Sequence, residues 1–369
     1  MNQIAICIGS IVIYWSAIVI FCAVAACFSL AYGLYAANGG KKSAMWAMLP
    51  VAVVLGVLFS RMIHWYCHAE QYAGFISAIT DYTAGDYVLP GAFIGVAVAV
   101  LLVRALRLTD SAALMFDCIA PAAALGVGIL RLSALFNNSC RGKIQILDPD
   151  LQCLPLGSAV QMANGAVEYR FATFFIEFIV MMVLFLIVMR LFNKRRNWPM
   201  QGETPVRGNV ALLFLAYYGA TQVILDSTRY DSSFLPINGF VSLVMILGAV
   251  SLAAVMVYYT VMSVRVNGFA AKHAVLWVLF LGAAGGAGYM EYLVQRYGNM
   301  YLPVYAGMTA LLLMMCMLVK TMYRSVCLSE DEKDRLELQA SMNPGLKEEA
   351  EEAEAVAEAA AEAQPEPAV

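Results

Sequence analysis

Long apolar runs alternate with short polar segments along most of the chain. A helix needs about 20 predominantly apolar residues to cross a bilayer. Nine runs approach or reach that length, so the pattern predicts nine membrane spans, and residues 4–10 before the first are expected to lie at the membrane interface. The predicted spans are 11–35, 44–65, 89–103, 110–136, 171–192, 209–225, 240–262, 274–293 and 302–322.

Composition supports the same class of protein. Of the 369 residues, 62% are hydrophobic and only 13% are charged, whereas soluble domains carry about 25% charged residues. We therefore expect an all-α, polytopic integral membrane helical bundle. The sequence has no Ser-His-Asp motif, no glycine-rich phosphate loop and no nucleic-acid signature, so nucleic acid is not an expected partner.

The pattern divides the chain into three parts. Residues 1–265 form a seven-span membrane core, in which the polar stretch 137–169 is expected to make a small head outside the membrane. Residues 266–323 add two transmembrane helices, and 324–369 form an Ala/Glu-rich tail that is strongly acidic from Ser329 onward. A helix over 330–340 is predicted because Ser329-Glu330-Asp331-Glu332 resembles a capping box.

Lysines and arginines in short loops predict the orientation, because cytoplasmic loops carry an excess of them. The span ends on one side of the membrane carry many more lysines and arginines than those on the other side, so we expect that side to be cytoplasmic. This orientation places the N-terminus and the head outside and the C-terminus in the cytoplasm. The predicted cytoplasmic set is Lys41, Lys42, Arg104, Arg107, Lys194, Arg195, Arg196, Arg207, Arg265, Lys272, Lys320 and Arg324. The opposite set is Arg141, Lys143, Arg170, Arg229 and Arg296.

An arginine inside the fourth span is the leading candidate for a site. Arg131 lies near the end of that span, where a charge costs roughly 2.5–3.5 kcal/mol on insertion scales and commonly faces the protein interior or water. The alternative is an arginine that extends its head to the interface. Asp117 is 14 residues earlier, about 21 Å along a helix, so the two cannot pair within that helix.

Three polar clusters are expected to converge at the outer ends of the spans. Arginine and amide groups gathered there suit a lipid phosphate, because a guanidinium binds phosphate through two hydrogen bonds. The alternative is a structural network in which Arg131 pairs with Asp117 or Glu177. The clusters are Arg131 with Asn137, Asn138 and Gly142; Arg170 with Glu177; and Tyr218, Gln222, Asp226 and Arg229, the last three on one helical face.

Two further patterns remain open. His64, Cys67 and His68 have the spacing of metal ligands on a helix, but they also suit an aromatic patch at the membrane interface. Cys140 and Cys153 share one polar loop and could pair in an oxidising compartment. No metal or cofactor is assigned from the sequence.

The central stretch from Asp117 through Arg131 to Gly142 and Lys143 resembles the signature helix and loop of the prolipoprotein diacylglyceryl transferase family. The resemblance covers residues 4–262, so the last two spans and the tail are additions. Further matching pieces, in the family's order, are 8–10 with 13–15, 91–95, 170–177, Tyr218-Gly219 with Asp226 and Arg229, and Ser242, Met245 and Gly248.

The resemblance implies a reaction at the outer face of the bacterial cytoplasmic membrane. A diacylglyceryl group would move from phosphatidylglycerol to the lipobox cysteine in the signal peptide of a preprolipoprotein. The catalytic residues would be Arg131, Glu177, Tyr218 and Asp226. The lipid headgroup would be bound by Arg131, Asn137, Gly142, Arg170 and Arg229.

The sequence departs from the family pattern at functional positions. Pro90 stands where the family has a histidine, Gln222 where it has an arginine, Asp226 where it has a glutamate and Ala134 where it has an asparagine. Either the chemistry persists with a substitute base, or the chain is a non-catalytic paralogue that binds lipid or lipoprotein. A small transporter ranks last, since no internal repeat is visible. The candidate substitute bases are His64, His68 and Glu177.

Overall fold

The computed structural model describes residues 4–8, 11–80, 87–137, 139–161, 165–196, 208–236, 238–297 and 301–342. Residues 9–10, Asn138, Arg207 and the tail residues 343–369, all named above, lie outside these ranges. The chain divides into two compact units, which are described separately. One comprises Met1–Val255 with Leu281–Cys316, and the other Met256–Phe280 with Met317–Val369.

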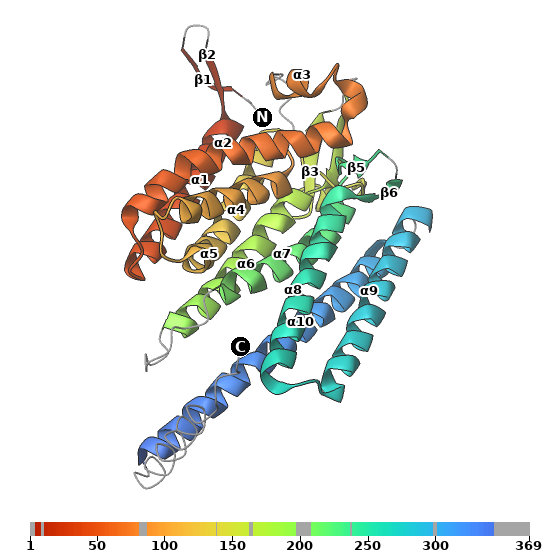
Figure 1. Ribbon diagram of the computed structural model, residues 1–369. Coiled ribbons are helices and arrows are strands. Elements are labelled where there is room, and N and C mark those ends of the chain that lie inside the picture. The colour runs from red at the N-terminus through yellow and green to blue at the C-terminus, as the bar shows by residue number, and fades with distance from the viewer. Residues whose placement is uncertain are drawn as a thin grey trace, which may run out of the picture. The chain divides into compact units, whose positions relative to one another are not determined.

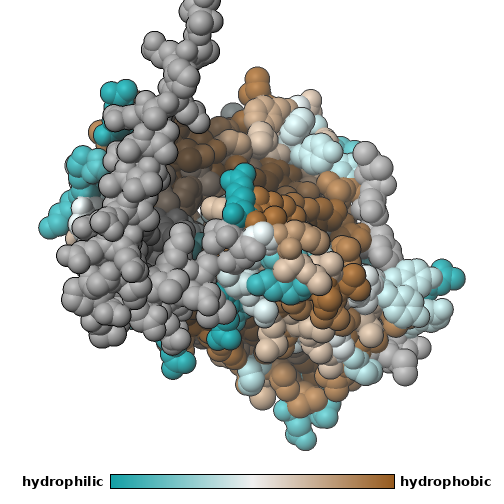
Figure 2. Space-filling model, turned by 60° about the horizontal axis from the view of Figure 1, so that its bottom comes forward, coloured by the Kyte–Doolittle hydropathy of each residue, from teal (hydrophilic) through white to brown (hydrophobic). Residues whose placement is uncertain are grey.

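Eight helices in the described residues are long and apolar enough to cross a membrane. This confirms a multi-pass, all-α membrane protein, and hydrophobic residues cover much of the face seen in Figure 2. The eight are α1 (Trp15–Ala37), α2 (Lys42–Cys67), α5 (Ala112–Arg131), α6 (Thr173–Arg196), α7 (Asn209–Ser227), α8 (Leu243–Asn267), α9 (Ala271–Tyr297) and α10 (Tyr301–Met342).

The third predicted span forms a shorter helix, α4 (Leu89–Ala105). Its 17 residues reach only about 26 Å at 1.5 Å per residue. It packs closely against α2, because a Cβ on Gly95 would lie 2.5 Å from the Cα of Gly56. Small residues commonly let transmembrane helices approach in this way.

Helix α5 occupies the centre of the first unit. It contacts α1, α4, α6 and α7, and its middle is rich in buried small residues, including Ala120, Ala122 and Ala124. Figure 1 shows α5 running through the bundle with α1, α4 and α6 beside it. The central position explains why an arginine at the end of this helix is buried rather than extended toward a lipid interface.

The N-terminal residues differ from the prediction. The first helix was expected from residue 11, but Ile4–Ile8 (β1) and Ile11–Tyr14 (β2) form an antiparallel hairpin. Helix α1 therefore begins at Trp15. The segment is dense in isoleucine and valine, whose branched side chains favour strands. The interfacial position of residues 4–10 stays a prediction.

Small hairpins also form at the end of the bundle where α5 and α7 finish and α6 and α8 begin, which we call the head end. The predicted head contains a short 3-10 turn, η3 (Pro149–Leu151), and β3 (Gly157–Gln161) paired with β4 (Val167–Phe171). Strands β5 (Phe234–Leu235) and β6 (Asn238–Ser242) form a second pair, so α8 starts at Leu243 instead of 240 (Figure 1).

The remaining short elements connect the spans. A 3-10 turn, η2 (Leu132–Leu135), extends α5, and η1 (Ala69–Gln71) and α3 (Phe75–Thr80) follow α2. Residues 330–340 are helical as predicted, but the helix does not begin at Ser329, because α10 runs without a break from Tyr301 to Met342. Good helix formers such as Glu, Leu, Lys and Arg fill the stretch across Ser329 and allow the helix to continue.

The second unit is held by polar contacts between parts of α8, α9 and α10. Ser263 Oγ lies 3.0 Å from His273 Nε2 and 2.9 Å from Ser325 Oγ. The indole nitrogen of Trp277 donates a 3.0 Å hydrogen bond to Thr260 Oγ1. The buried His273 is therefore a hydrogen-bonded core histidine.

Candidate functional site

A buried ion pair forms the centre of the site. Arg131, the last residue of α5, places its Nε 2.8 Å from Glu177 Oε1 on α6. Only 10% of the arginine side chain and 1% of the glutamate side chain are exposed. Of the two alternatives raised by the sequence, the structure selects Glu177. Asp117 instead accepts backbone hydrogen bonds from Gly208 and Ala211 and caps the start of α7.

Glu177 also has a partner on α7. The Nε2 group of Gln222 donates a 3.0 Å hydrogen bond to Glu177 Oε1, the same oxygen that faces Arg131. The other carboxylate oxygen, Oε2, has no hydrogen-bond partner within the described residues. Gln222 thus orients the carboxylate and leaves one of its oxygens available.

The terminal nitrogen of Arg131 faces a thiol. Its Nη1 donates to Cys140 Sγ at 3.3 Å, and a thiol sulfur is a weak acceptor. Arg229 is close enough to Arg131 for their like charges to interact. Two guanidinium groups are therefore gathered in one buried cluster at the head end.

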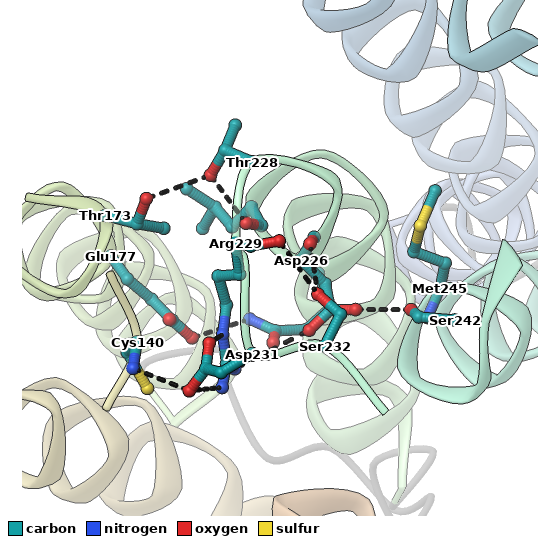
Figure 3. Close-up of polar contacts among 12 residues, drawn as sticks. Cys140, Thr173, Glu177, Asp226, Thr228, Arg229, Asp231, Ser232, Ser242 and Met245 are labelled. Atoms are coloured by element: carbon teal, nitrogen blue, oxygen red, sulfur yellow. Dashed lines mark hydrogen bonds and ion pairs between the residues drawn. The ribbon is translucent and has the colours of Figure 1, made fainter. Parts of the chain in front are cut away.

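Arg229 is held by two carboxylates. It makes a two-pronged contact with Asp231, at 3.0 Å and 3.1 Å, and its Nη1 lies 3.5 Å from Asp226 Oδ1. Ser242 Oγ donates to Asp226. Figure 3 shows Asp231 between Arg229 and Cys140, whose backbone N–H donates to it at 2.8 Å. Gln222, Asp226 and Arg229 were expected on one face of a helix. Gln222 and Asp226 lie one turn apart on α7, but Arg229 lies beyond the end of that helix at Ser227.

The charge of Asp231 follows from these contacts. Burial opposes its ionisation, but the nearby charge of Arg229, the hydrogen bonds from Arg229 and the Cys140 N–H outweigh that effect. The pKa of Asp231 therefore lies below its ordinary value. The cluster thus keeps an ionised carboxylate against Arg229.

Asn137 and Gly142 shape the loop that follows Arg131. Asn137 Oδ1 accepts the Ser139 N–H at 3.0 Å, and the Gly142 N–H donates to Phe171 O at 2.8 Å. A Cβ on Gly142 would lie 2.6 Å from the Cβ of Phe171, so only glycine fits there without displacement. Gly142 also forms a β-bridge with Arg229, which ties the loop to the end of α7.

Arg170 does not join Glu177, contrary to the expected cluster. It lies on β4 and pairs with Glu168 at 3.0 Å, and its guanidinium lies 5.2 Å from the ring centre of Tyr230. The chain changes from strand to helix between the two expected partners, at Thr173. The helical spacing used in the prediction therefore does not apply across this junction.

Tyr218 is buried between aromatic rings of α4 and α7. Its ring centre lies 4.9 Å from that of Phe93 and 5.6 Å from that of Phe214. Its hydroxyl has no hydrogen-bond partner among the residues that the structure describes, and Arg131 and Glu177 are its electrostatic neighbours. The hydroxyl is therefore available to a ligand at the ion pair.

Several residues of the buried cluster could not be identified as site residues from the sequence. Cys140 and Asp231 lie in polar loops and become part of the site only because the head loop and the segment after α7 meet.

Arg141 is also buried, and it donates to Ala134 O at 2.8 Å and lies over Phe174. Burial is the main reason that the pKa of Arg141 is lowered from its ordinary value. A cationic residue in the head loop was visible in the sequence, but its burial was not.

The structure also bears on the two patterns that the sequence left open, the histidine-cysteine group on α2 and the cysteine pair of the head loop. The rings of His64 and His68 stack with centres 4.3 Å apart, and no group of three potential metal ligands occurs in the described part of the chain. Cys140 is buried and Cys153 is exposed, and both are free thiols. Pro90 lies in the first turn of α4, where it offers no ionisable group.

Comparison with known proteins agrees with these motifs. The sequence model of the prolipoprotein diacylglyceryl transferase family matches residues 3–257. Three curated relatives are each named phosphatidylglycerol–prolipoprotein diacylglyceryl transferase. That of Lactiplantibacillus plantarum is 28% identical over 68% of this chain and 88% of its own length. Those of Pediococcus pentosaceus and Oceanobacillus iheyensis are each 25% identical, over 68% and 64% of this chain and 89% and 79% of their own lengths. Since the match spans more than half of its residues, the chain belongs to the prolipoprotein diacylglyceryl transferase family.

Proposed function

We propose that this protein transfers a diacylglyceryl group from phosphatidylglycerol to the lipobox cysteine of a preprolipoprotein. The names of the three relatives support the donor and the acceptor class. The buried cluster at the head end supports the site, because lipid headgroups lie at the ends of membrane helices.

The observation that carries the proposal is the buried guanidinium of Arg131. Glu177 engages its Nε, while its Nη1 meets only the weakly accepting Cys140 thiol among its described hydrogen bonds. A phosphate oxygen is a far stronger acceptor for that nitrogen. Arg229 brings a second guanidinium, so the two arginines would hold the phosphate together. Arg170, which is partly exposed, would serve as a further cation at the rim.

The reaction forms one bond and breaks one. The acceptor thiolate attacks the glyceryl carbon that carries the phosphate oxygen, a C–S bond forms, and the C–O bond breaks. Glycerol phosphate leaves with the electron pair as an anion, and fixed cationic donors stabilise the charge that develops. The guanidinium groups also favour the thiolate form of the attacking cysteine.

The acceptor proton needs a base. Glu177 is the best candidate, since its Oε2 is free of hydrogen bonds within the described residues and lies at the ion pair. The hydroxyl of Tyr218, which has no hydrogen-bond partner in the described ranges, would donate to the departing oxygen, and Asp226 would keep Arg229 in place. Asn137 and Gly142 would fix the loop that closes around the headgroup.

The location follows from the same proposal. We place the protein in the bacterial cytoplasmic membrane with its N-terminus and head end outside and its C-terminus in the cytoplasm. The lysines and arginines of the short loops support this orientation. Phosphatidylglycerol and the preprolipoprotein would then meet at the outer face.

A protein that binds lipid or lipoprotein without transfer is the second candidate. The observation that favours it is the pairing of Arg131 with Glu177 and of Arg229 with Asp226 and Asp231, together with Pro90 at the family's histidine position. Paired guanidinium groups can still bind phosphate, but without a competent base the reaction would not proceed.

The test is a transfer assay with purified protein in phosphatidylglycerol-containing liposomes and a lipobox peptide. Mass spectrometry should find the peptide with a diacylglyceryl group for the native protein and for Arg265→Ala, an exposed control arginine. Arg131→Ala should abolish the product. No transfer with Arg131-dependent binding of phosphatidylglycerol would select the second candidate, and absence of both would overturn the two together.

A further inference from the structure

A buried carboxylate lies in a helix outside the family match. Glu291 of α9 is 4% exposed, and the match ends at residue 257. Ser227 Oγ donates a 2.5 Å hydrogen bond to its Oε2, and Gln295 Nε2 donates a 2.8 Å hydrogen bond to its Oε1. An acid in a membrane helix is costly and by default marks a functional role. Its partner, Ser227, is the last residue of α7.

A second added helix reaches the same serine. The hydroxyl of Tyr305 on α10 donates a 3.2 Å hydrogen bond to the carbonyl oxygen of Ser227. The last carbonyls of a helix have no partner within it. Glu291 therefore holds the side chain of Ser227, and Tyr305 holds its carbonyl oxygen and also lies 3.4 Å from its hydroxyl; we call this arrangement the Ser227 clamp.

The clamped serine is directly connected to the site. Asp226, which faces Arg229, precedes it, and the backbone N–H of Arg229 donates to Asp226 O at 3.1 Å. Thr228 follows it and lies 3.1 Å from Thr173 on the first turn of α6. A shift of Ser227 would therefore move the support of Arg229.

We propose that Glu291 and Tyr305 are positioning residues for the transfer reaction, supplied by the two helices added to the family core. They act through Ser227 by fixing the end of α7, so that Asp226 and Arg229 keep their geometry toward the lipid phosphate. The inference rests on the proposed function for its kinetic consequence. The clamp itself can be tested without any turnover.

The first experiment is amide hydrogen exchange of the segment 226–231 in the full-length protein. Glu291→Leu and the milder Tyr305→Phe should each speed exchange of this segment about tenfold, since each removes a hydrogen bond that holds Ser227. Trp277→Phe is the matched control, because it removes a side-chain hydrogen bond of the same helix to Thr260. Equal exchange in all three variants and the native protein would overturn the clamp.

The second experiment separates positioning from general stability. For phosphatidylglycerol, kcat/KM should fall about tenfold in Glu291→Leu and recover in Glu291→Gln, whose amide oxygen can still accept from Ser227. Ser227→Ala combined with Glu291→Leu should cost no more than either change alone, since both remove the same bond. Additive losses in the double variant would contradict the proposal, and so would losses in Glu291→Gln or Trp277→Phe as large as the loss in Glu291→Leu.

The two experiments also distinguish this inference from the proposed function. A native protein without transfer activity would remove the proposed function, while exchange in the segment 226–231 would still decide whether the clamp exists. Transfer activity with normal kinetics in Glu291→Leu would keep the function and remove the positioning role.

Discussion

Arg131 Nε and Glu177 Oε1 lie 2.8 Å apart where the end of α5 meets the second turn of α6, and both side chains are buried. The pair joins two membrane helices at the head end and leaves one carboxylate oxygen and the terminal guanidinium nitrogens facing the rest of the cluster. Breaking it exposes an uncompensated charge to a low-dielectric interior. The pair is therefore both a structural link and the centre of the proposed chemistry.

Removing one member of this pair should destabilise the protein strongly. Arg131→Ala or Glu177→Ala alone is expected to lower the free energy of unfolding by about 3–5 kcal/mol, because the remaining charge stays buried without its partner. The double variant Arg131→Met/Glu177→Leu should lose much less than the sum. Denaturant unfolding in detergent micelles measures all three, and strictly additive losses would show that the two charges do not depend on each other.

Gln222 should matter through its hydrogen bond to Glu177. Gln222→Leu leaves that carboxylate with one partner fewer and is expected to cost about 1–3 kcal/mol of stability and to reduce transfer. The matched control is Thr221→Val on the same helix, which removes only a local bond to the carbonyl of Tyr218. Thermal unfolding and the transfer rate should both distinguish the two variants; similar values would mean that Gln222 does not orient Glu177.

The contribution of Asp231 to the stability of the folded protein should depend on pH. Its pKa in the folded protein is below the ordinary value of 3.8, so its ionised form stabilises the fold above that pH. This stabilisation is lost as the pH falls below 3.8 through the folded value. The difference in melting temperature between the native protein and Asp231→Asn should be constant near neutrality and shrink below pH 4.

The control for this titration is Asp110→Asn. Asp110 forms an exposed pair with Lys41, and such pairs contribute little. Its removal should change the melting temperature only slightly. An Asp231→Asn difference that stays unchanged down to pH 3 would contradict the assigned role of Arg229 in holding that carboxylate ionised.

Gly142 should tolerate no side chain. Its Cβ would meet Phe171 at 2.6 Å, and overpacking of this kind costs about 1–3 kcal/mol. Gly142→Ala is therefore expected to lower stability by that amount and to reduce transfer, because the loop after Arg131 must shift. Gly74→Ala is the control, since nothing lies within 4 Å of its Cβ. Equal behaviour of the two variants in thermal unfolding would remove the steric argument.

Hydropathy predicted the membrane helices well because burial in lipid depends on local composition. Arg131 on α5 and Asp226 on α7 stand out in the sequence as polar residues in apolar runs, and the structure places both in the buried cluster. The N-terminal hairpin was missed because an isoleucine-rich segment suits both a strand and a membrane helix. The unbroken α10 was missed because a capping pattern shows that a helix can begin at Ser329, not that it must.

Long-range partners could not be predicted from spacing. Arg170 and Glu177 were grouped on a helical repeat, but the chain changes from β4 to α6 between them. Cys140 and Asp231 meet although 91 residues separate them, and the contact depends on how the head loop folds over the end of α7. The proposed role of Glu291 likewise depends on a neighbour, Ser227, in another helix.

The most direct test of the account is the initial rate of glycerol phosphate release from phosphatidylglycerol in the presence of a lipobox peptide. We expect release by the native protein that requires the peptide cysteine and falls at least about a hundredfold in Arg131→Ala, as for loss of one charge-stabilising donor. Arg265→Ala should release glycerol phosphate at the native rate. Release that is unchanged in Arg131→Ala, or none from the native protein, would contradict the claim that this buried arginine stabilises the departing phosphate.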